Sequence, residues 1–191
     1  GSLLGHSQHG HMEAVGYDLY VKMLGQAIAR AKGEPVQRDK SECLIDLRVD
    51  AYIPETYIAD GPGRIEAYKR IAAIQTPEDA ADVLDELIDR YGEPPRTVNN
   101  LISVALLRAH AADNGISEIS QKGTNLNFYL DGFDLQRVSA LCAMEKYKSR
   151  LLFSAGEKPY LALRLKKGED ALKLGRKLVE DYAATAPRES A

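Results

Sequence analysis

The sequence contains only two cysteines, Cys43 and Cys142, and no Cys-x-x-Cys pair. This scarcity excludes a fold stapled by disulfides and favours buried thiols in a reducing compartment. No apolar run approaches the roughly 20 residues that a membrane-spanning helix needs, and no basic segment followed by an apolar one opens the chain. We therefore expect a soluble, cytoplasmic protein that does not associate with membranes.

Motifs typical of catalysis or cofactor binding are also lacking. There is no Gly-x-x-x-x-Gly-Lys-Ser/Thr loop, no Gly-x-Gly-x-x-Gly turn, no Gly-x-Ser-x-Gly turn and no zinc-type cysteine spacing. His6, His9 and His11 lie close together in a glycine-rich segment, but no cysteine or carboxylate completes a zinc shell there. We expect no metal, no cofactor and no catalytic site in this chain.

The chain length sets the domain organisation. With 191 residues, 45% of them hydrophobic, the chain has enough material for one main core and an appendage. Residues 1–33 combine a glycine-rich loop with apolar residues at helical spacing, which predicts a leading helix outside the compact domain. Residues 34–40 are typical of a linker. We place the compact domain at 41–185 and a disordered tail at 186–191, and the abrupt start indicates a fragment.

The compact domain shows both strand and helix periodicity. Alternating apolar residues predict a half-buried strand at 41–53, a hairpin formed by 116–121 and 126–130, and strands at 151–153 and 161–165. Helical spacing and capping residues predict helices around 65–71 and at 77–91, 95–114, 134–146 and 169–182. Because strands and helices alternate only in part, the expected fold class is α+β, with a small, mostly antiparallel sheet and several packed helices.

The helix predicted at 77–91 has one acidic side. Its expected buried face consists of Ala80, Leu84, Leu87, Ile88 and Tyr91. The opposite side carries Asp79, Asp82, Glu86 and Asp89. Like charges three and four residues apart destabilise a helix by roughly 0.2–0.5 kcal/mol per pair, so local stability does not account for this stripe. One interpretation is a solvated face that favours solubility, and the other is a docking surface for a basic partner.

The last third of the chain is basic. Ten side chains could follow a phosphate backbone: Lys146, Lys148, Arg150, Lys158, Arg164, Lys166, Lys167, Lys173, Arg176 and Lys177. Acidic residues interrupt this tract and the pI is about 5.9, so an ordinary solvated surface competes with this interpretation. An accessory nucleic-acid-binding domain is therefore the alternative function.

Four motifs carry a resemblance to a known family. Residues 3–20, Leu-Leu-Gly-x-x-Gln-x-Gly-His-Met-x-x-Val-Gly-Tyr-Asp-Leu-Tyr, resemble the end of the translocation motif shared by bacterial transcription-repair coupling factors and RecG-type helicases. Residues 51–58 (Ala-Tyr-Ile-Pro-Glu-x-Tyr-Ile), 64–72 (Arg-x-x-x-Tyr-Lys-Arg-Ile-Ala) and 86–95 (Glu-Leu-Ile-Asp-Arg-Tyr-Gly-x-Pro-Pro) look like the C-terminal domain of the coupling factors. The resemblance covers residues 3–115 well, and the remainder only through the order of its strands and helices.

The resemblance implies an ATP-driven DNA translocase that acts on stalled RNA polymerase at duplex DNA and recruits the repair protein UvrA. It implies that the C-terminal domain is an autoinhibitory clamp over the UvrA-binding module of the same chain, with Glu86 and Asp89 at the family's acidic clamp positions. The translocation-motif loop contains Gly5, Gln8 and Gly10, and Gln8 matches the glutamine that couples nucleotide state to movement. ATP and Mg²⁺ belong to the implied full-length protein, whereas this fragment is not expected to hydrolyse ATP.

Overall fold

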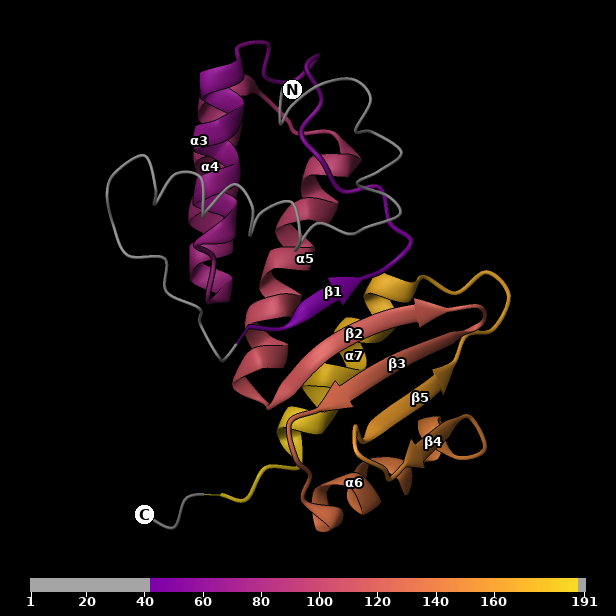
Figure 1. The fold of residues 1–191 in the computed structure, drawn as a ribbon. Helices are drawn as coiled ribbons and strands as arrows, with labels where there is room; N and C mark the ends of the chain where they lie inside the picture. Colours follow the sequence, from indigo (N-terminus) through magenta and orange to yellow (C-terminus); the bar gives the residue numbers. More distant parts are fainter. Residues whose placement is uncertain (1–41, 189–191) are drawn as a thin grey trace.

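A computed structural model describes residues 42–188 of the chain (Figure 1). These residues form five α-helices, one 3-10 helix and a five-stranded sheet. In chain order the elements are β1 (Leu44–Asp46), α3 (Gly61–Ala72), α4 (Pro77–Tyr91), α5 (Arg96–Asp113), β2 (Ile116–Lys122), β3 (Asn125–Leu130), α6 (Leu135–Cys142), η2 (Glu145–Tyr147), β4 (Leu151–Ser154), β5 (Tyr160–Arg164) and α7 (Ala171–Ala184). The leading helix, the linker, the histidine group and the loop of Gly5, Gln8 and Gly10 lie outside the described residues.

The sheet has the strand order β1-β2-β3-β5-β4. β1 pairs parallel with β2, and the other three pairings are antiparallel. A parallel pair needs a long crossover connection, and here α3, α4 and α5 supply it. The sheet is therefore mixed but mostly antiparallel, and the expected α+β class is confirmed.

Helix α5 connects the pair formed by α3 and α4 to the sheet. It contacts α3 and α4, and it also contacts α7, β1 and β2; Figure 1 shows α7 behind the strands. The period-two pattern of β3 buries Leu126, Phe128 and Leu130, which places these side chains on a single face of the sheet. No helix among residues 42–188 has both the length and the apolar character needed to cross a bilayer.

The structure confirms the predicted hairpin and the last two predicted strands, but the prediction of a long first strand at 41–53 is wrong. Only Leu44–Asp46 pairs with β2. The backbone then turns, because the Val49 N–H donates to the Leu47 carbonyl at 3.0 Å and the Arg48 N–H donates to the Gln121 side chain at 3.0 Å. Of the alternating residues that follow β1, Leu47, Ala51 and Ile53 are buried and Val49 is half-buried. The pattern therefore indicated burial rather than strand pairing.

Side chains of α3 hold the irregular segment that follows β1. The Ile53 N–H donates to the Tyr68 hydroxyl at 2.9 Å. The buried Arg64 guanidinium donates to the carbonyls of Ile58 and Ala59 at 2.7 and 2.9 Å. Buried backbone groups need hydrogen-bond partners, and these two side chains provide them where no neighbouring strand does. Two residues of the motif at 64–72 thus have structural roles.

Candidate functional site

Helix α4 begins with a capping box. The Thr76 hydroxyl accepts a hydrogen bond from the Asp79 N–H at 3.1 Å. The Asp79 carboxylate accepts in return from the N–H groups of Thr76 and Gln75, at 3.2 and 3.0 Å. Reciprocal bonds of this kind satisfy N–H groups that a helix start leaves without partners. The expectation that local stability explains none of the four stripe carboxylates is therefore wrong for Asp79.

Packing rotates the buried face of α4 relative to the expected one. Val83, which the sequence prediction omitted, is buried together with Leu87, while Ile88 and Tyr91 are half-buried. Residues three apart lie on neighbouring parts of a helix surface. Burial of Val83 thus brings Glu86 to the boundary of the packed face, and the Glu86 side chain is 31% exposed.

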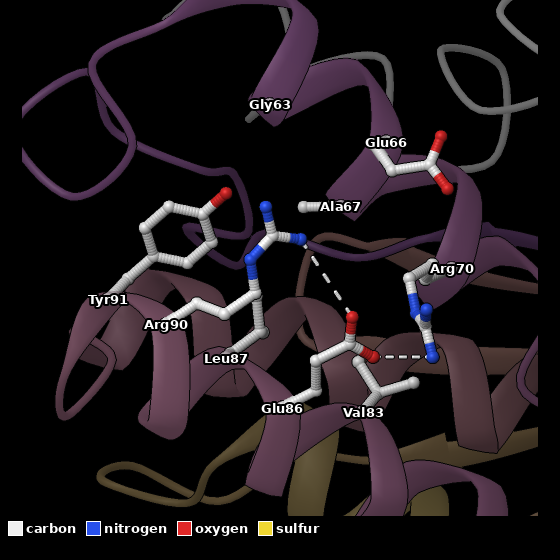
Figure 2. A pocket seen from close by; sticks show the side chains of 9 residues that line it. All are labelled: Gly63, Glu66, Ala67, Arg70, Val83, Glu86, Leu87, Arg90 and Tyr91. Atoms are coloured by element: carbon white, nitrogen blue, oxygen red, sulfur yellow. Dashed lines mark ion pairs between the residues drawn. The ribbon is translucent and has the colours of Figure 1, made fainter.

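Glu86 forms ion pairs within its own domain (Figure 2). Its Oε2 atom contacts the Arg70 guanidinium of α3, and its Oε1 atom lies 3.9 Å from the Arg90 guanidinium one turn further along α4. Arg90 also lies over the Tyr91 ring, 5.4 Å from its centroid. Glu86, which the sequence placed in the acidic stripe, is therefore paired with arginines of two helices.

The other carboxylates of the stripe face solvent. Asp82 and Asp89 are exposed, and so is Asp85, which lies three residues from Asp82 and four from Asp89. Among residues 42–188, none of the three has an ion pair. Sequence reasoning missed Asp85, although its spacing places it on the same side of the helix. The acidic face of α4, as the structure presents it, consists of Asp82, Asp85 and Asp89.

The C-terminal end of α4 is fixed by Tyr57. Its hydroxyl donates to the Gly92 carbonyl at 2.8 Å, with the Leu87 carbonyl oxygen 3.2 Å away. The Tyr57 and Tyr91 rings pack with centroids 5.8 Å apart. Burial raises the pKa of the Tyr57 hydroxyl above its ordinary value. The helix that presents the acidic face is thus held at both ends.

The contact between α3 and α4 leaves little free space. Gly63, Glu66 and Ala67 of α3 and Val83, Glu86 and Leu87 of α4 line a cavity of about 20 Å³, and Figure 2 shows these residues. A cavity of this size has room for about one water molecule, whereas pockets for small molecules usually measure a few hundred Å³. The gap between α3 and α4 is therefore too small for a bound metabolite.

The basic tract is neutralised only in part. Lys146 pairs with Asp181 at 3.0 Å, and Arg150 pairs with Glu169 at 2.6 Å. The Arg150 hydrogen bond, together with the bond from the Lys166 N–H, holds the pKa of Glu169 below its ordinary value.

Within the part of the chain that the structure describes, no group of three histidines, cysteines or carboxylates is arranged to hold a metal ion.

Comparison with known proteins gives consistent matches. The family model of the TRCF domain matches residues 47–139. The transcription-repair-coupling factor of Bacillus subtilis (strain 168) is 43% identical over 121 residues, which are 63% of this chain and 10% of that protein. The transcription-repair-coupling factor of Staphylococcus aureus (strain USA300) is 39% identical over 132 residues, which are 68% of this chain and 11% of that protein. The chain thus spans about a tenth of the length of these curated relatives.

A solved structure has a similar fold. The crystal structure of a C-terminal domain of transcription-repair coupling factor superposes with a TM-score of 0.64 at 22% sequence identity. The match covers 76% of this chain and 96% of that chain. At this level of identity the likeness concerns the fold alone. The acidic face of α4 lies within the residues that the TRCF model matches.

Proposed function

Because this chain belongs to the transcription-repair coupling factor family and is the C-terminal domain of such a factor, we propose that it is an autoinhibitory interaction domain. In this proposal the acidic face of α4 docks on a basic surface of the UvrA-binding module of the same protein and covers it. The observation that carries the proposal is the row of exposed carboxylates Asp82, Asp85 and Asp89 on a helix held at both ends.

The charge pattern of α4 favours an external partner. The negative end of the helix dipole disfavours acidic residues in the last turns, and like charges at helical spacing repel each other. Asp89 is three residues from the end of the helix at Gly92, so both effects act on it. A docked lysine or arginine would relieve them. Complementary charge sets register and association rate more than affinity, which suits a contact that must be released.

Glu86 has a different role in the same proposal. Each of its two carboxylate oxygens already contacts an arginine of this domain. A basic group of the module would then replace Arg70 or Arg90 rather than meet a free carboxylate. Pairs between partly exposed side chains contribute only about 0.2–1 kcal/mol, so such an exchange costs little. In this proposal Glu86 therefore contributes less to docking than Asp89 does.

The test is a binding titration between this chain and the separately expressed UvrA-binding module, measured by calorimetry at low salt. Replacing Asp82 and Asp89 with asparagine removes two exposed charges, and we expect the affinity to fall about 10-fold, from about 0.7 kcal/mol for each charge. The matched control is Asp131→Asn with Glu157→Gln, which removes the same charge from two exposed turns far from α4 in sequence. Equal affinity of the Asp82/Asp89 variant and the unaltered chain would refute the proposed docking face.

For the whole protein we propose the activity that the family likeness implies. ATP-driven translocation on duplex DNA, with Mg²⁺, would bring the whole protein to RNA polymerase. Release of this domain would then free the UvrA-binding module to bind UvrA. Gln8, between Gly5 and Gly10, would couple nucleotide state to movement. In the full-length protein, Gln8→Ala should therefore slow translocation while ATP binding remains. Unchanged translocation would refute that role and leave the proposed docking face untouched.

A further inference from the structure

A basic groove is formed by residues between α6 and α7. It has a volume of about 680 Å³ and is lined by η2, the turn after it, the end of β5 and the loop that follows. The groove lies outside the residues that the TRCF model matches. Six of the ten cations of the basic tract line it: Lys146, Lys148, Arg150, Arg164, Lys166 and Lys167.

Strand pairing assembles this groove from two separate stretches of the chain. β4 and β5 run antiparallel, and Leu151 of β4 faces Leu163 of β5. This register places the preceding Arg150 beside the following Arg164. The Arg150 guanidinium donates to the Arg164 carbonyl at 2.6 Å, and the Arg164 N–H donates to the Arg150 carbonyl at 3.0 Å. The two basic stretches are therefore held together by hydrogen bonds.

Half of the groove cations have acidic partners. Lys146, Lys148 and Arg150 pair with Asp181, Glu145 and Glu169, respectively. Arg164, Lys166 and Lys167 are exposed and, within residues 42–188, have no ion pair. These three adjacent positive charges repel each other. An anionic ligand that bridges them would remove that repulsion.

The turn on the other side of the groove is strained. Ser149 has φ of 62°, and among residues 42–188 it is the only non-glycine residue with a positive φ. For such residues the left-handed region costs about 1–2 kcal/mol, and strain of this kind often accompanies binding sites. The neighbouring Arg150 N–H bonds to the Tyr147 carbonyl at 3.2 Å. The strained turn directs the chain between Lys148 and Arg150 along the groove wall.

We propose that this groove binds the phosphate backbone of duplex nucleic acid without sequence preference. Lysine supplies four of its six cations, and lysine is depleted in protein–protein interfaces but serves well as a point charge for phosphate. No aromatic side chain lines the groove, and Leu165 is its one apolar side chain. Single-strand binding relies on aromatic stacking, and docked proteins rely on apolar anchors, so both are disfavoured against a duplex.

The test is fluorescence anisotropy of a labelled random-sequence DNA duplex titrated with the 191-residue chain. We expect a dissociation constant of about 10–100 µM at about 50 mM salt, which is typical of weak non-specific contacts. For each phosphate contact, a rise in salt from about 50 to about 200 mM weakens binding about 3.5-fold. Three contacts therefore predict a loss of about 40-fold over this range.

The groove variant combines Arg164→Gln, Lys166→Gln and Lys167→Gln. It should bind at least about 10-fold more weakly and lose about 2–3 units of the salt slope, which is about one unit per contact. The control variant removes one arginine and two lysines elsewhere in the tract: Lys158→Gln, Lys173→Gln and Arg176→Gln, all three of them exposed. It should stay within about 2-fold of the unaltered chain, since these bases lie outside the groove.

The proposal would be overturned by the absence of an anisotropy change at low salt, by equal losses in the groove and control variants, or by tighter binding of an acidic polyglutamate peptide than of the duplex. Tighter binding of a single strand would equally exclude the duplex as the ligand. Circular dichroism establishes that each variant is folded. If the triple groove variant does not fold, the double variant Lys166→Gln with Lys167→Gln is compared with the double variant Lys158→Gln with Lys173→Gln. Lys158, Lys166 and Lys167 lie outside strands and helices, and Lys173 is exposed on α7, so neither pair should disturb the fold.

Discussion

Replacing Arg70 with alanine tests whether the domain competes with its own partner for Glu86. Arg70 lies on α3, and its guanidinium contacts the Glu86 Oε2 atom across the narrow gap to α4. If a basic group of the UvrA-binding module must take this place, then removing Arg70 removes the competitor. We therefore expect Arg70→Ala to bind the module more tightly, although the substitution deletes an interaction of the folded domain.

The size of this effect follows from exposure. The Arg70 side chain is 47% exposed and that of Glu86 is 31% exposed, so water screens the pair and its contribution is about 0.2–1 kcal/mol. At about 1.4 kcal/mol per factor of ten, the affinity should rise by about 1.5-fold to about 5-fold. The free energy of unfolding should fall by no more than about 1 kcal/mol, because Arg90 remains near Glu86.

The assay is the calorimetric titration with the module, accompanied by urea unfolding of the same variant. Arg96→Ala is the matched control, because Arg96 is an exposed arginine at the start of α5 and its removal changes the net charge equally. An increase for Arg70→Ala that exceeds that of the control supports competition. Weaker binding would mean that Arg70 positions Glu86 for docking, and the competition argument would be refuted.

Three further predictions concern the folded domain. Thr76→Ala should lower the free energy of unfolding by about 1 kcal/mol, because it breaks the capping box of α4, and urea unfolding measures this. Tyr68→Phe leaves the Ile53 N–H without its partner and should cost about 1–3 kcal/mol in the same assay; an unchanged midpoint would contradict the assigned role. The Arg150 hydrogen bond lowers the pKa of Glu169 in the folded state, so this pair should stabilise the domain above pH 4.5, the ordinary value. That stabilisation should disappear as the pH falls through the lowered folded-state pKa, and Glu169→Gln should reduce the pH dependence of Tm there.

Local chemistry in the sequence was sufficient to predict most of the secondary structure. Two alternating runs, 116–121 and 126–130, predicted the hairpin, and Gly123, with φ of 60°, lies in the turn between β2 and β3. Thr76 followed by Pro77 predicted the start of α4, because a capping side chain and a proline at the first position act within one helical turn. These signals need no distant residue, and the structure confirms them.

The prediction of a long first strand was wrong for a physical reason. Alternating apolar residues record which side chains are buried, and Leu47 and Ile53 are buried as the pattern requires. A strand also needs a neighbouring backbone, and the Arg48 N–H donates to the side chain of Gln121 instead of to a backbone carbonyl of β2. Whether a partner strand continues alongside is decided by the whole chain, so periodicity alone gave the wrong secondary structure at this point.

For the candidate sites, the sequence by itself determined that one side of α4 is acidic and that the last third is rich in bases. Only the tertiary structure decided what each charge meets. Helical spacing predicted a stripe containing Glu86, but α3 brings Arg70 to that carboxylate, and no projection of one helix contains its neighbour. The pairing of β4 with β5 likewise joins Arg150 to Arg164. Charges act through distance in space, and distance along the chain does not fix it.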